Sequence, residues 1–93
     1  MATRYITVTE LCSFHEVEDV LIIELSDSGL FSLVDTGNGP CVAEADLQIV
    51  ESMLRLHTDL GINAAGVETI MHMRHKMEVL QRELRYLRTR LGE

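Results

Sequence analysis

The last third of the chain carries a seven-residue repeat of apolar side chains. No proline occurs from residue 64 to residue 91, and the repeat advances by 3, 4, 3, 4, 3 and 4 residues through Ile70, Met73, Met77, Leu80, Leu84, Leu87 and Leu91. An isolated helix in water has no reason to keep such a seam, which is typical of a helix that packs along a partner. The repeat therefore predicts a long C-terminal helix over about residues 64–91.

Two arrangements would bury this seam. The helix can pair with the same helix of a second copy, or it can pack back on its own domain. In the second case the apolar stripe is usually wider, and its residues recur with the period of a straight helix, about 3.6 residues. Val79 and Tyr86 add width only at one flank. We favour self-association, so the seven seam residues are the predicted dimer interface, with parallel and antiparallel pairing both open.

The length and composition predict one small domain. Ninety-three residues are enough for one modest core and too few for two. Hydrophobic residues make up 46% of the chain, but aromatic residues only 4%, and tryptophan is absent. Such a core depends on Leu, Ile, Val and Met and is often helped by a partner chain. We expect a single domain over residues 1–93, with its core over about residues 1–63.

Two short helices are predicted near the N-terminus. Thr9 is a good N-cap for the first helix, which continues through His15. A break near Glu16 leads to a second helix over residues 16–27, which Gly29 is expected to end in left-handed C-cap geometry. Two short helices joined by a tight turn predict a helix-turn-helix.

A turn-rich segment and two further helix caps follow. Residues 35–40 read DTGNGP, in which Asn-Gly favours positive φ and proline cannot continue a strand ladder. Apolar stretches flank this segment, so it predicts a small hairpin, or wing, with a plain connector as the alternative. Asp46 then caps an amphipathic helix that ends near Leu60, and Asn63 caps the long helix.

The second short helix is both acidic and apolar. It reads EVEDVLIIELSD and holds five carboxylates and no Lys or Arg. Successive helical residues are about 100° apart, so residues 20–23 span about 300° and cannot all face one core. With Val17, Ile22 and Leu25 inward, the outer side carries Asp19, Val20, Ile23, Glu24 and Asp27. Apolar anchors ringed by charge are typical of an interface, although cover by the wing or by a dimer mate would also explain the outer apolar residues.

The charge is distributed unevenly along the chain. Residues 1–54 hold ten acidic residues against Arg4 alone, a net charge of −9, whereas residues 55–93 hold seven basic and five acidic residues, a net charge of +2. The acidic part repels a phosphate backbone, and the C-terminal part attracts one only mildly. We therefore do not expect DNA to be the partner.

The sequence predicts neither an enzyme nor a metal or cofactor site. It lacks the spacing of a Ser/His/Asp or Cys/His site, a phosphate-binding glycine loop and a carboxylate pair with a reason to have split pKa values. His72 and His75 are three residues apart on one helix, but no further ligand is placed beside them. No catalytic residue is assigned.

The expected compartment is the cytoplasm. No uninterrupted apolar span is long enough to cross a membrane, and no signal peptide is recognised before the domain. Cys12 and Cys41 occur in neither a CxxC motif nor a zinc-ligand pattern, which fits a reduced compartment.

The order of these segments resembles the winged helix-turn-helix of the MerR superfamily, through ITVTEL at 6–11, GLF at 29–31 and LGIN at 60–63 before a terminal coiled-coil helix. Within that superfamily the sequence is more closely similar to CbpM-type chaperone modulators. That similarity rests on the TELC-like first helix, the acidic second helix, RLH at 55–57 and LRYLRTRL at 84–91. It covers nearly the whole chain. The fold it implies is mainly α: a MerR-like winged helix-turn-helix with a small β wing and a C-terminal coiled-coil helix.

The resemblance implies a binding function. CbpM-type proteins inhibit a DnaJ-like co-chaperone, the curved-DNA-binding protein CbpA, by binding its J-domain. A J-domain presents a basic helix to its partner. DNA-reading relatives carry arginines on the second helix where this chain has Val20 and Ile23, and usually a glycine at the turn where it has Glu16. We expect the outer side of the second helix to bind a J-domain, with the chain a homodimer. The alternative is a MerR-like DNA-binding transcriptional regulator that uses its wing and basic tail.

Overall fold

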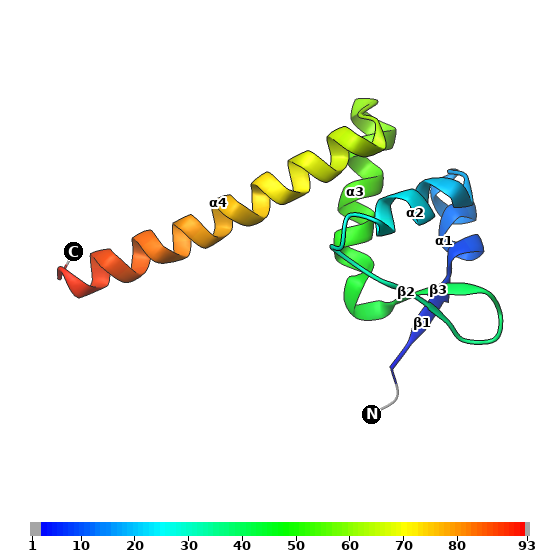
Figure 1. Ribbon diagram of the computed structural model, residues 1–93, viewed down its shortest axis with the longest axis horizontal. Helices are drawn as coiled ribbons and strands as arrows, with labels where there is room; N and C mark the ends of the chain where they lie inside the picture. The colour runs from blue at the N-terminus through cyan, green and yellow to red at the C-terminus, as the bar shows by residue number, and fades with distance from the viewer. Residues whose placement is uncertain (1–2, 93) are drawn as a thin grey trace.

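The helices and strands follow the order that the sequence predicts. The structure is a computed structural model that describes residues 3–92. Its elements are β1 (Tyr5–Thr7), α1 (Val8–His15), α2 (Asp19–Ser26), β2 (Leu33–Asp35), β3 (Pro40–Ala43), the 3₁₀ turn η1 (Glu44–Asp46), α3 (Leu47–Leu60) and α4 (Ala64–Arg90). The sheet and the first three helices form a head from which α4 projects (Figure 1). The expected mainly α winged helix-turn-helix with a β wing and a long C-terminal helix is confirmed.

Helix α1 begins earlier than predicted, and Thr7 rather than Thr9 is its N-cap. Thr7 Oγ1 accepts a hydrogen bond from Glu10 N at 3.1 Å. Thr9 lies within the helix, and its hydroxyl donates to Asp19 Oδ2 at 3.1 Å. The prediction was wrong because Val8 is fully buried and packs into the core as the first helical residue. Thr7 is therefore the last extended residue and takes the cap position.

The turn between α1 and α2 has left-handed backbone geometry at a glutamate. Glu16 has φ 57° and ψ 44°, the one positive φ at a non-glycine residue in the part of the chain that is described. Val17 N donates to Cys12 O at 3.0 Å and Glu16 N donates to Ser13 O at 3.4 Å. These are the two bonds of a Schellman motif, in which glycine is usual because it has no Cβ. The motif turns the chain sharply, and α2 then packs against α1.

Helix α2 is shorter than the predicted range 16–27. Asp27 follows it with φ −68°, so the expected left-handed C-cap at Gly29 is wrong. Gly29 does have a positive φ, 80°, but it lies beyond the helix in the following turn. Ser28 N donates to Leu25 O at 3.1 Å and Gly29 N to Ser26 O at 3.3 Å. These bonds tighten the chain into a 3₁₀-like turn, which satisfies the last carbonyl groups without a left-handed residue at the cap.

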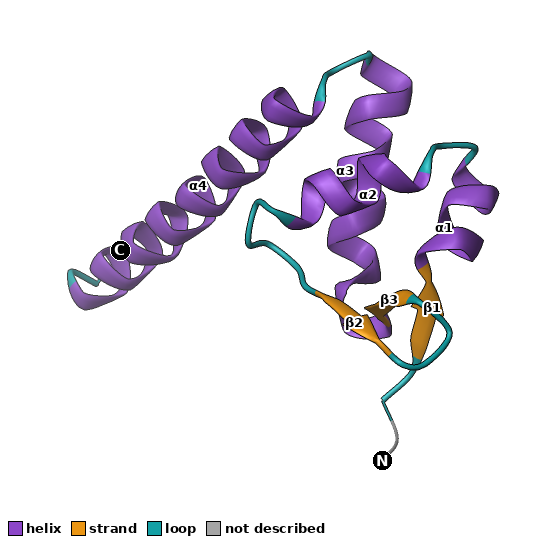
Figure 2. Ribbon diagram, turned by 45° about the vertical axis from the view of Figure 1, so that its right-hand side comes forward, coloured by secondary structure: helices purple, strands orange, loops and turns teal. Residues whose placement is uncertain are grey.

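The wing is a paired hairpin and not a plain connector. Strands β2 and β3 are antiparallel, with Asp35 opposite Pro40. In the loop between them Gly37 and Gly39 have φ 100° and 92°, and Gly37 N donates to Asp35 Oδ1 at 2.8 Å. Strand β1 pairs with the other edge of β3, which gives the order β1-β3-β2 (Figure 2). The sheet therefore ties the wing to the start of α1.

The core is aliphatic, as the composition predicts. It joins the inner faces of all four helices to the sheet through Val8, Leu11, Cys12, Leu21, Ile22, Leu25, Phe31, Val42, Val50, Met53, Leu54, Ala64, Val67 and Met71. Phe31 is the one aromatic member of this set. Within residues 3–92 no polar or charged residue is fully buried.

The corner between α3 and α4 is fixed by caps at both helix ends. Gly61, with φ 68°, ends α3 as predicted and its N–H donates to His57 O at 3.1 Å. Asn63 Oδ1 accepts from Gly66 N at 2.8 Å and caps α4, also as predicted. His57 Nδ1 donates to the carbonyl oxygen of Ile62 at 2.8 Å, since a carbonyl can only accept. Asp46 occupies the N-cap position of α3, but its side chain makes no capping hydrogen bond.

Only the first turns of α4 pack on the head. Ala64, Val67 and Met71 are buried there. From residue 72 to residue 92 every side chain is exposed except that of Val79, which is half-buried. Helix α4 therefore does not fold back along its own domain, and the molecule extends 53 Å along its longest axis (Figure 1).

Candidate functional site

Helix α2 has one buried side and one exposed side. Its buried residues are Leu21, Ile22 and Leu25, which span about 100° of the helix at about 100° per residue. Ile22 and Leu25 face inward as expected, and Leu21 is an inward residue that the sequence analysis did not assign. The opposite arc of about 140° holds the five predicted partner-binding residues, all of them exposed. We call Asp19, Val20, Ile23, Glu24 and Asp27 the acidic–apolar face.

The apolar residues of this face are open to solvent. Val20 is 62% exposed and Ile23 is 45% exposed, so the wing does not cover them. The carboxylates beside them have no cationic partner in the described chain, where the one ion pair joins Arg4 to Glu44 at 3.9 Å. Asp19 accepts a hydrogen bond from the Thr9 hydroxyl. Two apolar anchors and three unpaired carboxylates are therefore available to another molecule.

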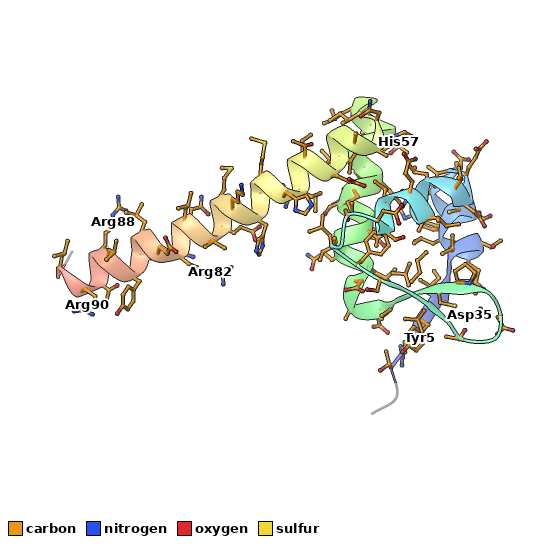
Figure 3. All side chains as sticks on the ribbon, in the orientation of Figure 1. Tyr5, Asp35, His57, Arg82, Arg88 and Arg90 are labelled. Atoms are coloured by element: carbon orange, nitrogen blue, oxygen red, sulfur yellow. The ribbon has the colours of Figure 1, made fainter. Side chains whose placement is uncertain are left out.

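A groove of about 550 Å³ runs beside α2, between the α1–α2 turn and the end of α3. We call it the turn groove; its lining residues are Glu16, Val17, Glu18, Val20, Leu21, Glu24, His57 and Thr58. The three glutamates are exposed, whereas Leu21 is buried and Val17 is half-buried. The groove thus has an apolar floor and an acidic rim. Figure 3 places His57 at the end of α3 remote from Tyr5 and Asp35 of the sheet.

The turn groove contains residues that the sequence analysis did not group with the face. Val20 and Glu24 belong to both surfaces. The spacing of Val17, Val20, Leu21 and Glu24 follows one helical stripe and could have indicated one wall. The opposite wall comes from α3, and no local pattern predicts which α3 residues meet the turn.

The helix-turn-helix offers no cation for a phosphate backbone. Residues 5–54, which include α1, α2 and the wing, contain no Lys or Arg. Contacts to phosphates and base edges depend mainly on such side chains or on Asn and Gln in the inserted helix. Six of the eight basic residues lie instead on α4, and three of them, Arg82, Arg88 and Arg90, are labelled in Figure 3. The guanidinium of Arg90 lies 5.8 Å from the Tyr86 ring centroid.

The seam of α4 has no partner within the described chain. Six of its seven residues are exposed, by 48% to 75%: Met73, Met77, Leu80, Leu84, Leu87 and Leu91. Ile70 is half-buried. Their 3- and 4-residue spacing places these side chains along one side of the helix. The seam is therefore a continuous apolar surface that begins where the packing of α4 on the head ends.

No metal site is formed by the described residues. In residues 3–92 no group of three or more His, Cys, Asp or Glu side chains is placed to hold an ion. His72 and His75 are exposed on α4. Cys12 and Cys41 are both free and buried. Burial raises the pKa of the Cys12 thiol to about 11, with the Asp19 carboxylate adding to the shift, so this thiol is protonated at neutral pH and is a poor nucleophile.

Of the helices in the described part of the chain, none combines the length and the hydropathy needed to cross a bilayer.

Comparison with known proteins identifies the family. Among curated proteins no sequence matches this chain. The profile of one family, described as "MerR HTH family regulatory protein", matches residues 6–89. The matched range runs from β1 to the last turn of α4 and includes the helix-turn-helix, the wing and the corner between α3 and α4. The chain therefore belongs to the MerR helix-turn-helix family of regulatory proteins.

Proposed function

We propose that this chain is a non-catalytic protein-binding modulator of the CbpM type. It inhibits a DnaJ-like co-chaperone, of the CbpA kind, by binding the J-domain through the acidic–apolar face. The basic helix of the J-domain is the surface that an Hsp70 partner uses, so the bound modulator and Hsp70 would compete for it. The finer assignment within the MerR family rests on the sequence resemblance to CbpM-type modulators.

The observation that carries the proposal is the chemistry of the exposed side of α2. In a DNA-reading winged helix this side would carry cations. Here it carries Asp19, Glu24 and Asp27 around the exposed side chains of Val20 and Ile23. A basic, amphipathic helix is the partner that satisfies both features, since carboxylates speed encounter and set selectivity while the apolar pair supplies much of the affinity.

The test is a calorimetric titration of this protein with a purified J-domain from the same organism at two salt concentrations. We expect a dissociation constant that is micromolar or tighter and that weakens with salt, because the carboxylates are exposed and screened. Val20→Asp and Ile23→Arg should each weaken binding by about tenfold or more, since each places a charge in the centre of the contact.

Val34→Asp is the matched control for Val20→Asp. Val34 is also an exposed valine, but it lies on the wing strand β2. We expect it to leave J-domain binding unchanged. Circular dichroism spectra should show that all three variants are folded. Folded Val20→Asp and Ile23→Arg variants that bind as tightly as the unmodified protein would show that the acidic–apolar face is not the contact.

A DNA-binding regulator is the second candidate, and it is compatible with membership of the MerR family. In that reading the contacts come from the wing and from the basic residues of α4: Arg74, Lys76, Arg82, Arg85, Arg88 and Arg90. Fluorescence polarisation with a random DNA duplex at low salt separates the two. An increase in polarisation that shows DNA binding, together with no J-domain binding, would favour the regulator.

We also propose that the protein is a homodimer joined through the seam of α4. A seam that is exposed over several turns places a large apolar surface in water, and monomeric proteins seldom leave such a patch open. A second copy offers the same spacing of 3 and 4 residues along its own helix, which is the requirement for knobs-into-holes packing.

A further inference from the structure

We propose that the turn groove seats one long basic side chain, lysine or arginine, from the partner's helix. This inference rests on the proposed function in one respect, namely that the partner presents a basic helix. It extends the contact beyond the acidic–apolar face, across the α1–α2 turn to the end of α3. The predicted contact then has two parts, which are the exposed apolar pair of α2 and a groove that receives a cation.

The shape and lining of the groove match this occupant. Its floor includes buried Leu21 and half-buried Val17, and its rim carries three exposed carboxylates, those of Glu16, Glu18 and Glu24. Lysine and arginine have the same division, with an apolar stem and a charged head, and they bury the stem on apolar surface while the head stays hydrated or ion-paired. A neutral or acidic side chain would leave the three carboxylates of the groove without a cationic partner.

No lysine or arginine of the described residues lines this groove. Residues 5–54 lack Lys and Arg, and the ion pair that the described residues form, between Arg4 and Glu44, involves none of the three glutamates. His57 also lines the groove, and its Nδ1 donates to the carbonyl oxygen of Ile62. Like charges gathered at one rim repel one another and attract a cation from outside. Charge complementarity therefore specifies a basic occupant.

The left-handed backbone at Glu16 makes a sharp experiment possible. Glu16→Gly removes one carboxylate from the rim and also relieves the Cβ strain of a positive φ. The variant should therefore fold at least as well as the unmodified protein, so any loss of binding cannot come from unfolding. We expect J-domain binding, measured by calorimetry, to weaken by about twofold to fivefold, the range of one partly exposed ion pair.

A second variant fills the groove from within. Thr58 is exposed on α3 and lines the groove, so Thr58→Arg places the chain's own cation among the three carboxylates. We expect binding to weaken by about tenfold or more, since the new arginine would occupy the groove and repel the basic side chain of the partner.

Glu83→Gln is the matched control for Glu16→Gly, because it removes an exposed carboxylate from α4, away from the groove. It should bind as the unmodified protein does.

The outcomes separate this inference from the proposed function. If the J-domain binds, Ile23→Arg weakens binding, and Glu16→Gly and Thr58→Arg have no effect, the groove inference is overturned and the proposed function stands. If the J-domain does not bind at all, the proposed function fails, and the groove is then titrated with a synthetic amphipathic helix rich in lysine and arginine. Binding of that peptide, lost in Thr58→Arg, supports the groove as a seat for a basic side chain, and no binding overturns it.

Discussion

At position 16 a glutamate holds a backbone conformation that glycine adopts at lower cost. A left-handed residue with a Cβ costs about 1–2 kcal/mol. The gain from replacing it with glycine is smaller than this, because glycine has greater conformational freedom in the unfolded chain. We expect Glu16→Gly to raise the free energy of unfolding by about 0.5–1 kcal/mol, measured as a shift of the urea midpoint at constant slope.

The control for this prediction is Glu16→Ala, which removes the same charge but keeps a Cβ. It should lie close to the unmodified protein in stability. Equal gains in both variants would trace the effect to the carboxylate and not to the φ of 57°. A stability gain that is specific to glycine would mean that the chain keeps a glutamate here at a cost in folding.

Among the elements, the helices with a clear repeat of apolar residues could be predicted from the sequence, and the ends of the short helices could not. The apolar spacing of α3 and α4, with Gly61 and Asn63 as their caps, located both helices correctly. The N-cap of α1 was missed because the burial of Val8 decides where that helix starts, and burial depends on the sheet and α3. For the same reason the sequence indicated the α2 side of the candidate site but not His57 and Thr58 across the groove.

Gly66 lies in the first turn of α4, where replacement by alanine would usually stabilise a helix. In an open helical position Gly→Ala gains about 1 kcal/mol. At Gly66 an added Cβ would lie 2.7 Å from Ile62 Cγ2 and 3.2 Å from Asn63 Oδ1, the oxygen that caps the helix. We therefore expect Gly66→Ala to lower the free energy of unfolding, since the corner must open or the cap must be lost.

Thr69→Ala is the control for the substitution at Gly66. Thr69 is exposed one turn later in the same helix, and alanine there should give a small gain from helix propensity. Urea denaturation of both variants measures the contrast. A Gly66→Ala protein that is more stable than the unmodified one would show that the α3–α4 corner relaxes without cost.

For the whole molecule, the exposed length of α4 links helix content to oligomeric state. In proteins most of the stability of a helix comes from the packing of its apolar face and not from helix propensity. If the seam pairs as proposed, Leu80→Lys with Leu87→Lys should give a monomer in sedimentation equilibrium, with a weaker helical signal at 222 nm. Gln81→Lys with Arg88→Lys changes neighbouring exposed positions and should leave the dimer intact. An unmodified protein that is monomeric and fully helical at micromolar concentration would contradict the pairing.

The projection of α4 also separates charge in space. Residues 1–54 carry a net charge of −9 and residues 55–93 carry +2, while the distal arginines lie far out along α4 (Figure 3). The negative potential is therefore concentrated around the head, so an approaching basic partner is attracted to the head before contact. Added salt shortens the reach of this attraction, because the screening length is about 10 Å at 0.1 M. Ionic strength should therefore act mainly on the association rate constant and only weakly on the dissociation rate constant.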